Sequence, residues 1–236
     1  MVLKTGDARP GTGDGGRGTG DRKNISRRRL KQSAKVLLFL AALIPAALLV
    51  RGIVTSNLGV NPAETIQLST GRWALKFLLL ALAITPVRRL TGWNVLIQYR
   101  RMLGLFAFFY ASLHLSAYIV LDQYFAFDAM VTDVLKRPFI TMGMAAWLLM
   151  LPLAITSTRG WIRRLGRRWS RLHRLVYVSG VCAAIHFAWK QKVFTGDAVR
   201  YAAVLAVLLG IRLVWVLRPS LKSAVRPGNA AARQQS

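Results

Sequence analysis

The sequence contains a single cysteine, Cys182, and only three histidines. One cysteine cannot form a disulfide framework, and it cannot supply an iron–sulfur or cysteine-rich zinc site. Cys182 lies inside an apolar run, where a small buried residue is its ordinary role. Any metal bound through soft or borderline ligands would therefore depend mainly on the three histidines.

Acidic residues are also scarce, with 8 Asp and Glu against 34 Lys and Arg, so the net charge is +26. Such a charge is often a sign of nucleic-acid binding. No nucleic-acid recognition motif accompanies it here, so we predict no nucleic-acid partner. The positions of the charges, between apolar runs, indicate a membrane protein instead.

Long apolar runs are abundant, and 54% of the residues are hydrophobic. Six runs have about 15–20 residues each, close to the roughly 20 that a membrane-spanning helix needs. They lie at residues 36–54, 73–87, 102–121, 138–156, 172–190 and 199–217. None shows the sustained alternation of a barrel strand. We predict an all-α integral membrane protein, a bundle of six transmembrane helices without an internal repeat.

The distribution of charge predicts the orientation of the bundle. If the N-terminus is cytoplasmic, most basic residues lie on the cytoplasmic side, as the positive-inside rule requires. Beyond the N-terminal tail, all acidic residues lie on the opposite side: Glu64, Asp122, Asp128, Asp133 and Asp197. We therefore predict that both termini are cytoplasmic and that the basic segments contact anionic membrane lipid. Residues 55–71 form an outer loop in this topology.

Three parts of the chain follow from these patterns. Residues 1–34 form a tail that is basic and rich in glycine, too poor in large apolar side chains to fold. Residues 35–218 form the membrane domain, with Pro45 as a kink in its first helix. Residues 219–236 form a second disordered tail. The basic segment 157–171 is expected to lie along the membrane surface as a short helix.

His114 and His186 lie inside two apolar runs that cross the membrane in the same direction in this topology. Each lies about 20 Å from the cytoplasmic start of its helix, at 1.5 Å per residue. Titratable residues at such depth are rare and usually functional. Two neutral imidazoles opposed at one level suit the axial positions of haem iron, although each ring could equally hydrogen-bond a neighbouring helix. Gly180 would leave room for a macrocycle.

His173 lies 13 residues before His186, near the cytoplasmic side, and about 140° around an ideal helix from it. It could bind a second haem or reside at the membrane interface. The matching position on the third helix is Arg100, which is a poor iron ligand but a good partner for a haem propionate. Arg212, near the inner end of the sixth helix, could pair with a propionate or extend to the cytoplasmic rim.

Several motifs, in order and at their spacings, carry a resemblance to a known family. They are Gln98–Leu105, Tyr110–His114, Ile155–Ser157, Trp169–Tyr177 and the later His186, with Thr85-Pro86 at the end of the second helix. Over residues 36–218 the chain resembles the MsrQ (formerly YedZ) family. That family lies within the wider ferric-reductase-like transmembrane group.

The resemblance implies a membrane subunit that binds one or two b-type haems in the bacterial inner membrane. Such a subunit passes electrons from the quinone pool or a cytoplasmic flavin reductase to a periplasmic, MsrP-like molybdopterin methionine sulfoxide reductase. His114, His186 and His173 would be iron ligands. The resemblance also implies FMN and quinone, for which the sequence shows no motif. The wider group carries two histidines on each ligand helix, so Arg100 departs from its pattern.

Two other classes of function stay open at this point. One is a different transmembrane haem carrier, such as a ferric reductase or a quinol-linked cytochrome b. The other is a membrane scaffold or transporter without redox chemistry. Against a transporter, the sequence shows no pair of interrupted helices in corresponding halves.

Overall fold

The structure, a computed structural model, describes residues 17–191 and 196–224, which are helical apart from short connections. Nine α-helices occur in this part of the chain: α1 (Arg17–Val54), α2 (Pro62–Thr91), α3 (Ile97–Ala117), α4 (Phe127–Lys136), α5 (Pro138–Ile155), α6 (Arg159–Leu165), α7 (Arg167–Leu172), α8 (Leu175–Lys190) and α9 (Gly196–Ala224). A 3₁₀ turn, Asn94–Leu96, precedes α3, and a π-helical segment, Tyr118–Asp122, follows it. The prediction of an all-helical fold is confirmed.

The chain divides into two units, one ending at Ile44 and the other beginning at Pro45. Pro45 lies inside α1, where it removes one hydrogen bond of the helix. The first unit consists of the first part of α1, which begins at Arg17 rather than near residue 35, where we expected the first helix to start. At the other end of the chain, α9 continues to Ala224, past the predicted boundary at residue 218.

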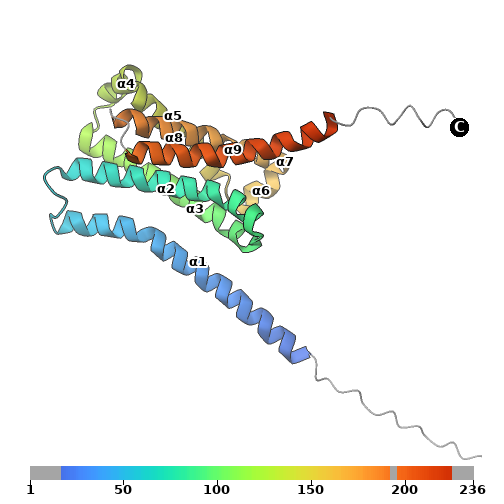
Figure 1. The fold of residues 1–236 in the computed structure, drawn as a ribbon. Coiled ribbons are helices and arrows are strands. Elements are labelled where there is room, and N and C mark those ends of the chain that lie inside the picture. The colour runs from blue at the N-terminus through green and yellow to red at the C-terminus, as the bar shows by residue number, and fades with distance from the viewer. Residues whose placement is uncertain (1–16, 192–195, 225–236) are drawn as a thin grey trace, which may run out of the picture. The chain divides into compact units, whose positions relative to one another are not determined.

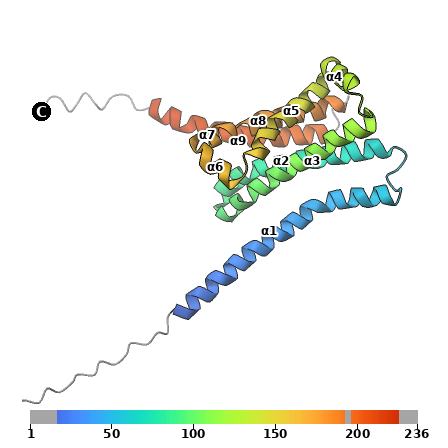
Figure 2. The ribbon, with the colours of Figure 1, turned by 180° about the vertical axis from the view of Figure 1, so that it is seen from behind.

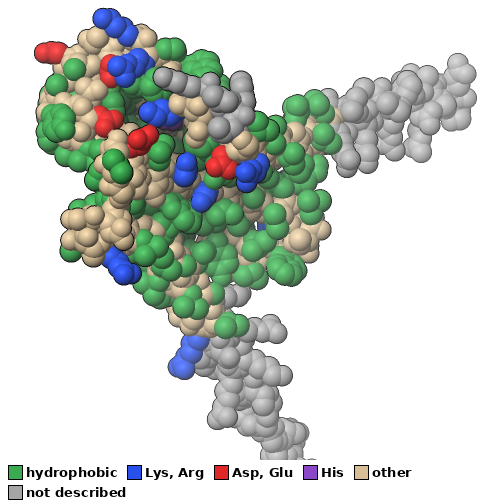
Figure 3. Space-filling model, turned by 60° about the vertical axis from the view of Figure 1, so that its left-hand side comes forward, with side chains coloured by type: hydrophobic (Ala, Val, Ile, Leu, Met, Phe, Trp, Pro, Cys, Tyr) green, Lys and Arg blue, Asp and Glu red, His purple; other side chains and the backbone are tan. Residues whose placement is uncertain are grey.

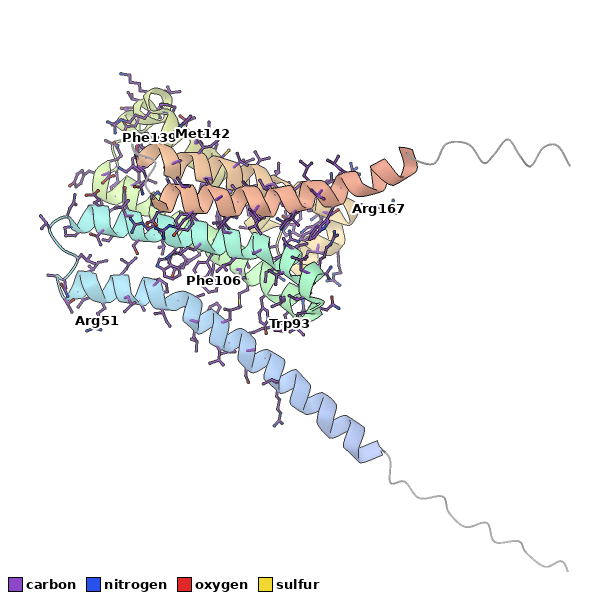
Figure 4. All side chains as sticks on the ribbon, in the orientation of Figure 1. Arg51, Trp93, Phe106, Phe139, Met142 and Arg167 are labelled. Atoms are coloured by element: carbon purple, nitrogen blue, oxygen red, sulfur yellow. The ribbon has the colours of Figure 1, made fainter. Side chains whose placement is uncertain are left out.

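The second unit is a bundle built on two helix pairs. The helices α2 and α3 form the closest pair, and α5 and α8 form the other (Figures 1 and 2). The helix α9 packs on α8 and α2, and α4 packs on α5. At one end of the bundle, here called the α4 end, α2 and α5 begin and α3 and α8 finish. Figure 4 labels Phe139 at this end, and Trp93 and Arg167 at the opposite, α6–α7 end.

Aromatic packing holds α2 against α3. Tyr110 is completely buried and stacks on Phe77 with ring centres 5.4 Å apart, while Phe106 meets Phe77 at 5.6 Å. The Tyr110 hydroxyl also accepts a hydrogen bond of 3.1 Å from the backbone amide of Ala46. Aromatic pairs in such offset and tilted arrangements contribute about 0.5–1.5 kcal/mol beyond their buried area. This cluster fixes the position of α3 beside α2.

The start of α2 differs from our prediction of an outer loop at 55–71. The helix begins at Pro62, a residue whose fixed φ suits the first helical position. Asn61 caps it, because its side-chain oxygen accepts from the Glu64 amide at 3.2 Å. The outer loop is therefore short, and about three further helical turns carry polar residues into the bundle.

The region of His173 also differs from the single helix predicted over 172–190. The helix α7 ends at Leu172 and α8 begins at Leu175, so His173 lies in the turn between them. Short-range hydrogen bonds, from the Arg174 amide to the Arg171 carbonyl and from the Tyr177 amide to the Arg174 carbonyl, form this turn. The angle expected between His173 and His186 on one ideal helix therefore does not apply.

Four helical segments in the described residues are long and apolar enough to cross a membrane: Gln32–Val54, Asn94–Asp122, Pro138–Ile155 and Gly196–Leu217. Many of their large hydrophobic side chains are exposed, as suits contact with lipid tails. Figure 3 shows hydrophobic side chains over the flanks, with Lys, Arg, Asp and Glu gathered on the α4 end. The protein is thus a helical membrane protein.

Candidate functional site

His114 on α3 and His186 on α8 lie close together inside the bundle. Their ring centres are 6.0 Å apart and their planes are inclined by 72°. The helix pairs bring together two residues that are 72 positions apart in the chain. This confirms the prediction that the two rings meet at one level.

Each ring is held by a backbone carbonyl of the neighbouring helix. Nδ1 of His114 lies 2.9 Å from the carbonyl oxygen of Gln67 on α2, and Nδ1 of His186 lies 2.6 Å from that of Phe139 on α5. A carbonyl oxygen can only accept, so Nδ1 is the protonated nitrogen in both rings. Nε2 is then unprotonated, which is the form that binds a metal.

The two halves of the site repeat one arrangement. Each histidine follows its carbonyl partner by 47 residues. A glycine lies one helical turn beyond that carbonyl, Gly71 in one half and Gly143 in the other. The pair α2–α3 thus corresponds to the pair α5–α8, although we predicted no internal repeat. The residues shared by the two halves are too few to show as sequence similarity.

A cavity of about 210 Å³ extends along the two rings. Toward the middle of the bundle its walls are apolar, and toward the α4 end they become polar. The apolar residues include Leu75, Leu78, Trp147, Met150 and Phe187. Trp147 also donates a 3.1 Å hydrogen bond from its indole to Ser112, which ties α5 to α3. The cavity is an apolar slot with a charged mouth.

Three cations line that mouth: Arg72, Arg137 and Lys190. Asp122, also in the lining, accepts a 2.6 Å hydrogen bond from Gln67, and Arg137 forms a 3.3 Å ion pair with Asp133. The Nε atom of Arg72 is buried and has no hydrogen-bond partner among the described residues. Such an unpaired buried donor suits an anionic ligand group.

The donor set fits haem better than a metal ion bound by protein alone. In the described residues no group of three or more His, Cys, Asp and Glu side chains could hold a metal ion. Two metal–nitrogen bonds of about 2 Å, each continued by about 1 Å to the ring centre, place two imidazoles about 6 Å apart. The observed 6.0 Å matches this. Haem supplies four nitrogen ligands to its own iron, so the protein would need to supply only these two imidazoles.

His173 lies elsewhere, toward the α6–α7 end, and is absent from the lining of this cavity. Its ring stacks on Trp169 with centres 3.9 Å apart, and its Nδ1 lies 3.2 Å from the Trp169 carbonyl. Burial lowers the pKa of His173, and the positive charge of Arg100 lowers it further, against the opposing effect of the carbonyls of Trp169 and Leu153. The ring is therefore neutral at neutral pH.

Arg100 and Arg212 gather near His173, not near the histidine pair. Arg100 is close enough to act electrostatically on both His173 and Arg212. The Arg212 guanidinium lies 5.1 Å from the ring centre of Tyr177 and donates to the carbonyls of Leu208 and Leu82. Its Nε is buried without a partner in the described residues. Three of the predicted site residues thus form a second, basic cluster.

One further expectation was wrong, and other site residues were missed from the sequence. Gly180 faces Leu205 and Leu82, within 3.5–3.6 Å of an added Cβ, and does not line the cavity. Arg72, which directly precedes the predicted apolar run 73–87, was not recognised as a site residue. The signal that could have identified Gly71 and Gly143 is their shared spacing of 43 residues before His114 and His186.

Part of the helical bundle is similar to a recognised class of membrane domain. Residues 70–184 match the family described as "Ferric reductase like transmembrane component". This segment includes His114 and His173 and ends two residues before His186.

Similar proteins define the family more narrowly. A protein of Xanthomonas euvesicatoria pv. vesicatoria is 53% identical over 189 residues, which cover 78% of this chain and 86% of the relative. Proteins of Ralstonia nicotianae and Herminiimonas arsenicoxydans are 47% and 46% identical over 205 and 202 residues. These cover 86% and 84% of this chain, and 94% and 93% of the relatives. All three are named "Protein-methionine-sulfoxide reductase heme-binding subunit MsrQ". The chain belongs to the MsrQ family.

Proposed function

We propose that this protein is a b-type cytochrome subunit that carries electrons across the bacterial inner membrane to a periplasmic methionine sulfoxide reductase. The observation that supports it most is the histidine pair, with ring centres 6.0 Å apart beside an apolar cavity. Haem bound there would supply a reversible one-electron carrier. The names of the relatives support the link to methionine sulfoxide reduction.

In this proposal His114 and His186 would hold the haem iron, each through Nε2, because Nδ1 is bonded to a helix carbonyl. Leu75, Leu78 and Met150 exclude water from the macrocycle. Arg72, Arg137 and Lys190 at the mouth bind the propionates. The protein itself breaks no substrate bond; it orients the cofactor and sets its potential.

We further propose that α2 and α8 also cross the membrane, which gives six spans with both termini in the cytoplasm. The charges support this orientation. Glu64, Asp122, Asp128, Asp133 and Asp197 all lie in elements at the α4 end, and the strongly basic α6 and α7 lie at the other. By the positive-inside rule the α4 end is periplasmic. The histidine pair then lies in the outer half of the bundle, on the side of the reductase.

A second haem near the cytoplasmic side is part of the proposal. His173 would be its ligand, with Arg100 and Arg212 as propionate partners in place of a second histidine. The unpaired Nε of Arg212 supports an anion there, and within the described residues neither arginine forms an ion pair. Two haems, one near each side of the membrane, would divide the electron transfer across it into two shorter steps. Electrons would enter from quinol or from a flavin reductase with FMN.

Transfer to the reductase is the direct test of the proposed function. Reduction of one sulfoxide to the thioether consumes two electrons and two protons, so two one-electron transfers are needed. In right-side-out membrane vesicles, the haem reduced beforehand should be reoxidised when periplasmic methionine sulfoxide reductase and a sulfoxide substrate are added outside. Inverted vesicles should show no reoxidation. Haem that stays reduced in right-side-out vesicles with an active reductase would contradict the proposal.

Removal of the Arg72 charge should lower the haem potential. Without a cation beside it, a propionate carries an uncompensated negative charge that favours ferric iron. At a separation of about 8–16 Å, a unit charge contributes on the order of 1–2 kcal/mol at an effective dielectric constant of about 20. This corresponds to a shift of about 40–90 mV for a one-electron couple. The measurement is a redox titration of Arg72→Gln.

Lys76→Gln provides the matched control for this titration. Lys76 lies one turn further along α2, does not line the cavity, and has its ammonium 4.3 Å from the ring centre of Trp73. Its loss should leave the potential nearly unchanged. Equal shifts in both variants would show a general charge effect and would contradict a specific role for Arg72.

A further inference from the structure

Gly71 and Gly143 are not explained by helix geometry alone. Each lies inside a regular helix, α2 or α5, where glycine is about 1 kcal/mol less favourable than alanine. Neither is at a turn, and neither has a left-handed backbone conformation. Both glycines lie against the imidazoles of the site, and this contact explains why neither position carries a side chain.

Residues four apart lie on the same face of a helix. Gly71 is four residues after Gln67, and Gly143 is four residues after Phe139. Each glycine therefore lies directly beside the carbonyl that receives the histidine Nδ1–H. A side chain at this position would fill the space that the imidazole must enter to reach the carbonyl.

The distances show how tight this approach is. A Cβ atom added to Gly71 would lie 3.1 Å from Nδ1 and 3.2 Å from Cε1 of His114. A Cβ added to Gly143 would lie 2.8 Å and 2.9 Å from the same atoms of His186. All four distances are shorter than an ordinary van der Waals contact of a Cβ atom. The Cβ added to Gly143 would lie closer to its histidine than the Cβ added to Gly71, so His186 would have to move more than His114.

We propose that Gly71 and Gly143 are positioning residues, which admit the two imidazoles to the helix carbonyls and so fix their tautomer, tilt and height in the cavity. Both act through the histidines and touch neither iron nor substrate. The proposal deepens the proposed function, because it explains how the ligand pair is set. The arrangement is the same in both halves of the bundle, which makes coincidence a poor explanation.

Substitution by alanine separates this role from packing. In Gly143→Ala the His186 ring must shift away from the added Cβ. We expect this shift to weaken its hydrogen bond to the Phe139 carbonyl, so that the Nδ1–H tautomer is less strongly enforced and Nε2 moves within the cavity. Gly71→Ala should do the same to His114 to a smaller extent. In Gly210→Ala, on α9, an added Cβ meets nothing within 4 Å. This third variant controls for the exchange of a helical glycine as such.

The experiment has two readouts, made on full-length protein with an affinity tag free of histidine. The first is haem retention and the low-spin electron paramagnetic resonance signal, which depends on the angle between the two imidazole planes. Loss of an outer partner of a metal-binding histidine typically weakens binding by about 10–100-fold. We expect weaker retention and a changed signal in the order Gly143→Ala, then Gly71→Ala, with Gly210→Ala like wild type.

The second readout is solid-state ¹⁵N spectroscopy of haem-free protein in lipid, with label in histidine only. The whole chain has three histidines, so the spectrum contains six ring-nitrogen signals, which the single histidine-to-alanine variants assign to their residues. Gly143→Ala should alter the tautomer signal of His186 alone, Gly71→Ala that of His114 alone, and His173 should stay unchanged in both. This readout tests the glycines even if wild type binds no haem, a result that would overturn the proposed function.

Unchanged tautomers and an unchanged paramagnetic signal in Gly143→Ala would overturn the positioning role. Thermal unfolding of the haem-free variants guards against simple misfolding, and their melting temperatures should be close to that of wild type. If Gly143→Ala does not fold, Gly71→Ala, with its smaller displacement, decides by the same two readouts.

Discussion

Replacing His186 by alanine should abolish six-coordinate, low-spin haem at the outer site. The variant loses the ring whose centre lies 6.0 Å from that of His114. Loss of outer-shell partners alone weakens metal binding by about 10–100-fold, so removal of a ligand should exceed about 100-fold. His114→Ala should have the same effect, and the double variant should add little, because two axial ligands act as one unit. The measurement is a reduced-minus-oxidised spectrum with haem counted per chain.

Trp189→Ala is the control on the same helix. Trp189 is half exposed and lies three residues from His186. Its variant should keep the full outer-site spectrum. Low-spin haem that survives intact in both histidine variants would remove this ligand assignment while leaving haem binding itself in place.

Replacing His173 by alanine should remove one of two haems and leave the other unaltered. The proposed inner site would depend on a single histidine, with Arg100 where a second ligand would be expected, so its haem should be lost completely. The outer pair should be untouched, because His173 does not line that cavity. Haem content per chain should fall by half in His173→Ala, while the signal of the outer pair stays unchanged.

The contrary result would be equally clear for His173. One haem per chain in wild type, unchanged in His173→Ala, would show that the ring is structural. Its stacking on Trp169 and its carbonyl contacts would then be its whole role. Arg100→Gln and Arg212→Gln should weaken only the inner haem, which distinguishes them from Arg72→Gln at the outer site.

The sequence predicted what depends on composition and spacing along one helix. Apolar runs located the main helices, and equal distances from the predicted membrane edge placed His114 and His186 at one level. The structure confirms that the two rings meet. The same reasoning carried the prediction of six spans and cytoplasmic termini, which rests on charge and stays a prediction.

Features that depend on contacts between helices could not be predicted in this way. The carbonyl partners of the histidines lie 47 residues away on other helices. Every residue type has a backbone carbonyl, so the residue identities do not reveal which carbonyl a histidine contacts. Arg72 precedes the apolar run predicted from residue 73, so that run did not indicate its place in the cavity wall. Gly180 was chosen for its place between two histidines, but its direction is set by the packing of α8 on α9.

His173 shows a related limit. Helical angles were calculated for an unbroken helix, whereas α7 and α8 are separated by a turn. The turn consists of His173 and Arg174 and contains neither glycine nor proline, so no helix-breaking residue indicated it. The stacking of His173 on Trp169, four residues earlier, fits the end of α7 and not the start of α8.

The central claim is that His114 and His186 hold one haem between them with their rings strongly inclined. Electron paramagnetic resonance of oxidised wild-type protein in lipid tests this most directly. An interplanar angle of 72° predicts a low-spin signal of the highly anisotropic kind given by bis-imidazole haem with near-perpendicular planes. That signal should disappear in His114→Ala and in His186→Ala. Folded wild-type protein that binds no haem, or that shows only high-spin iron, would contradict the account.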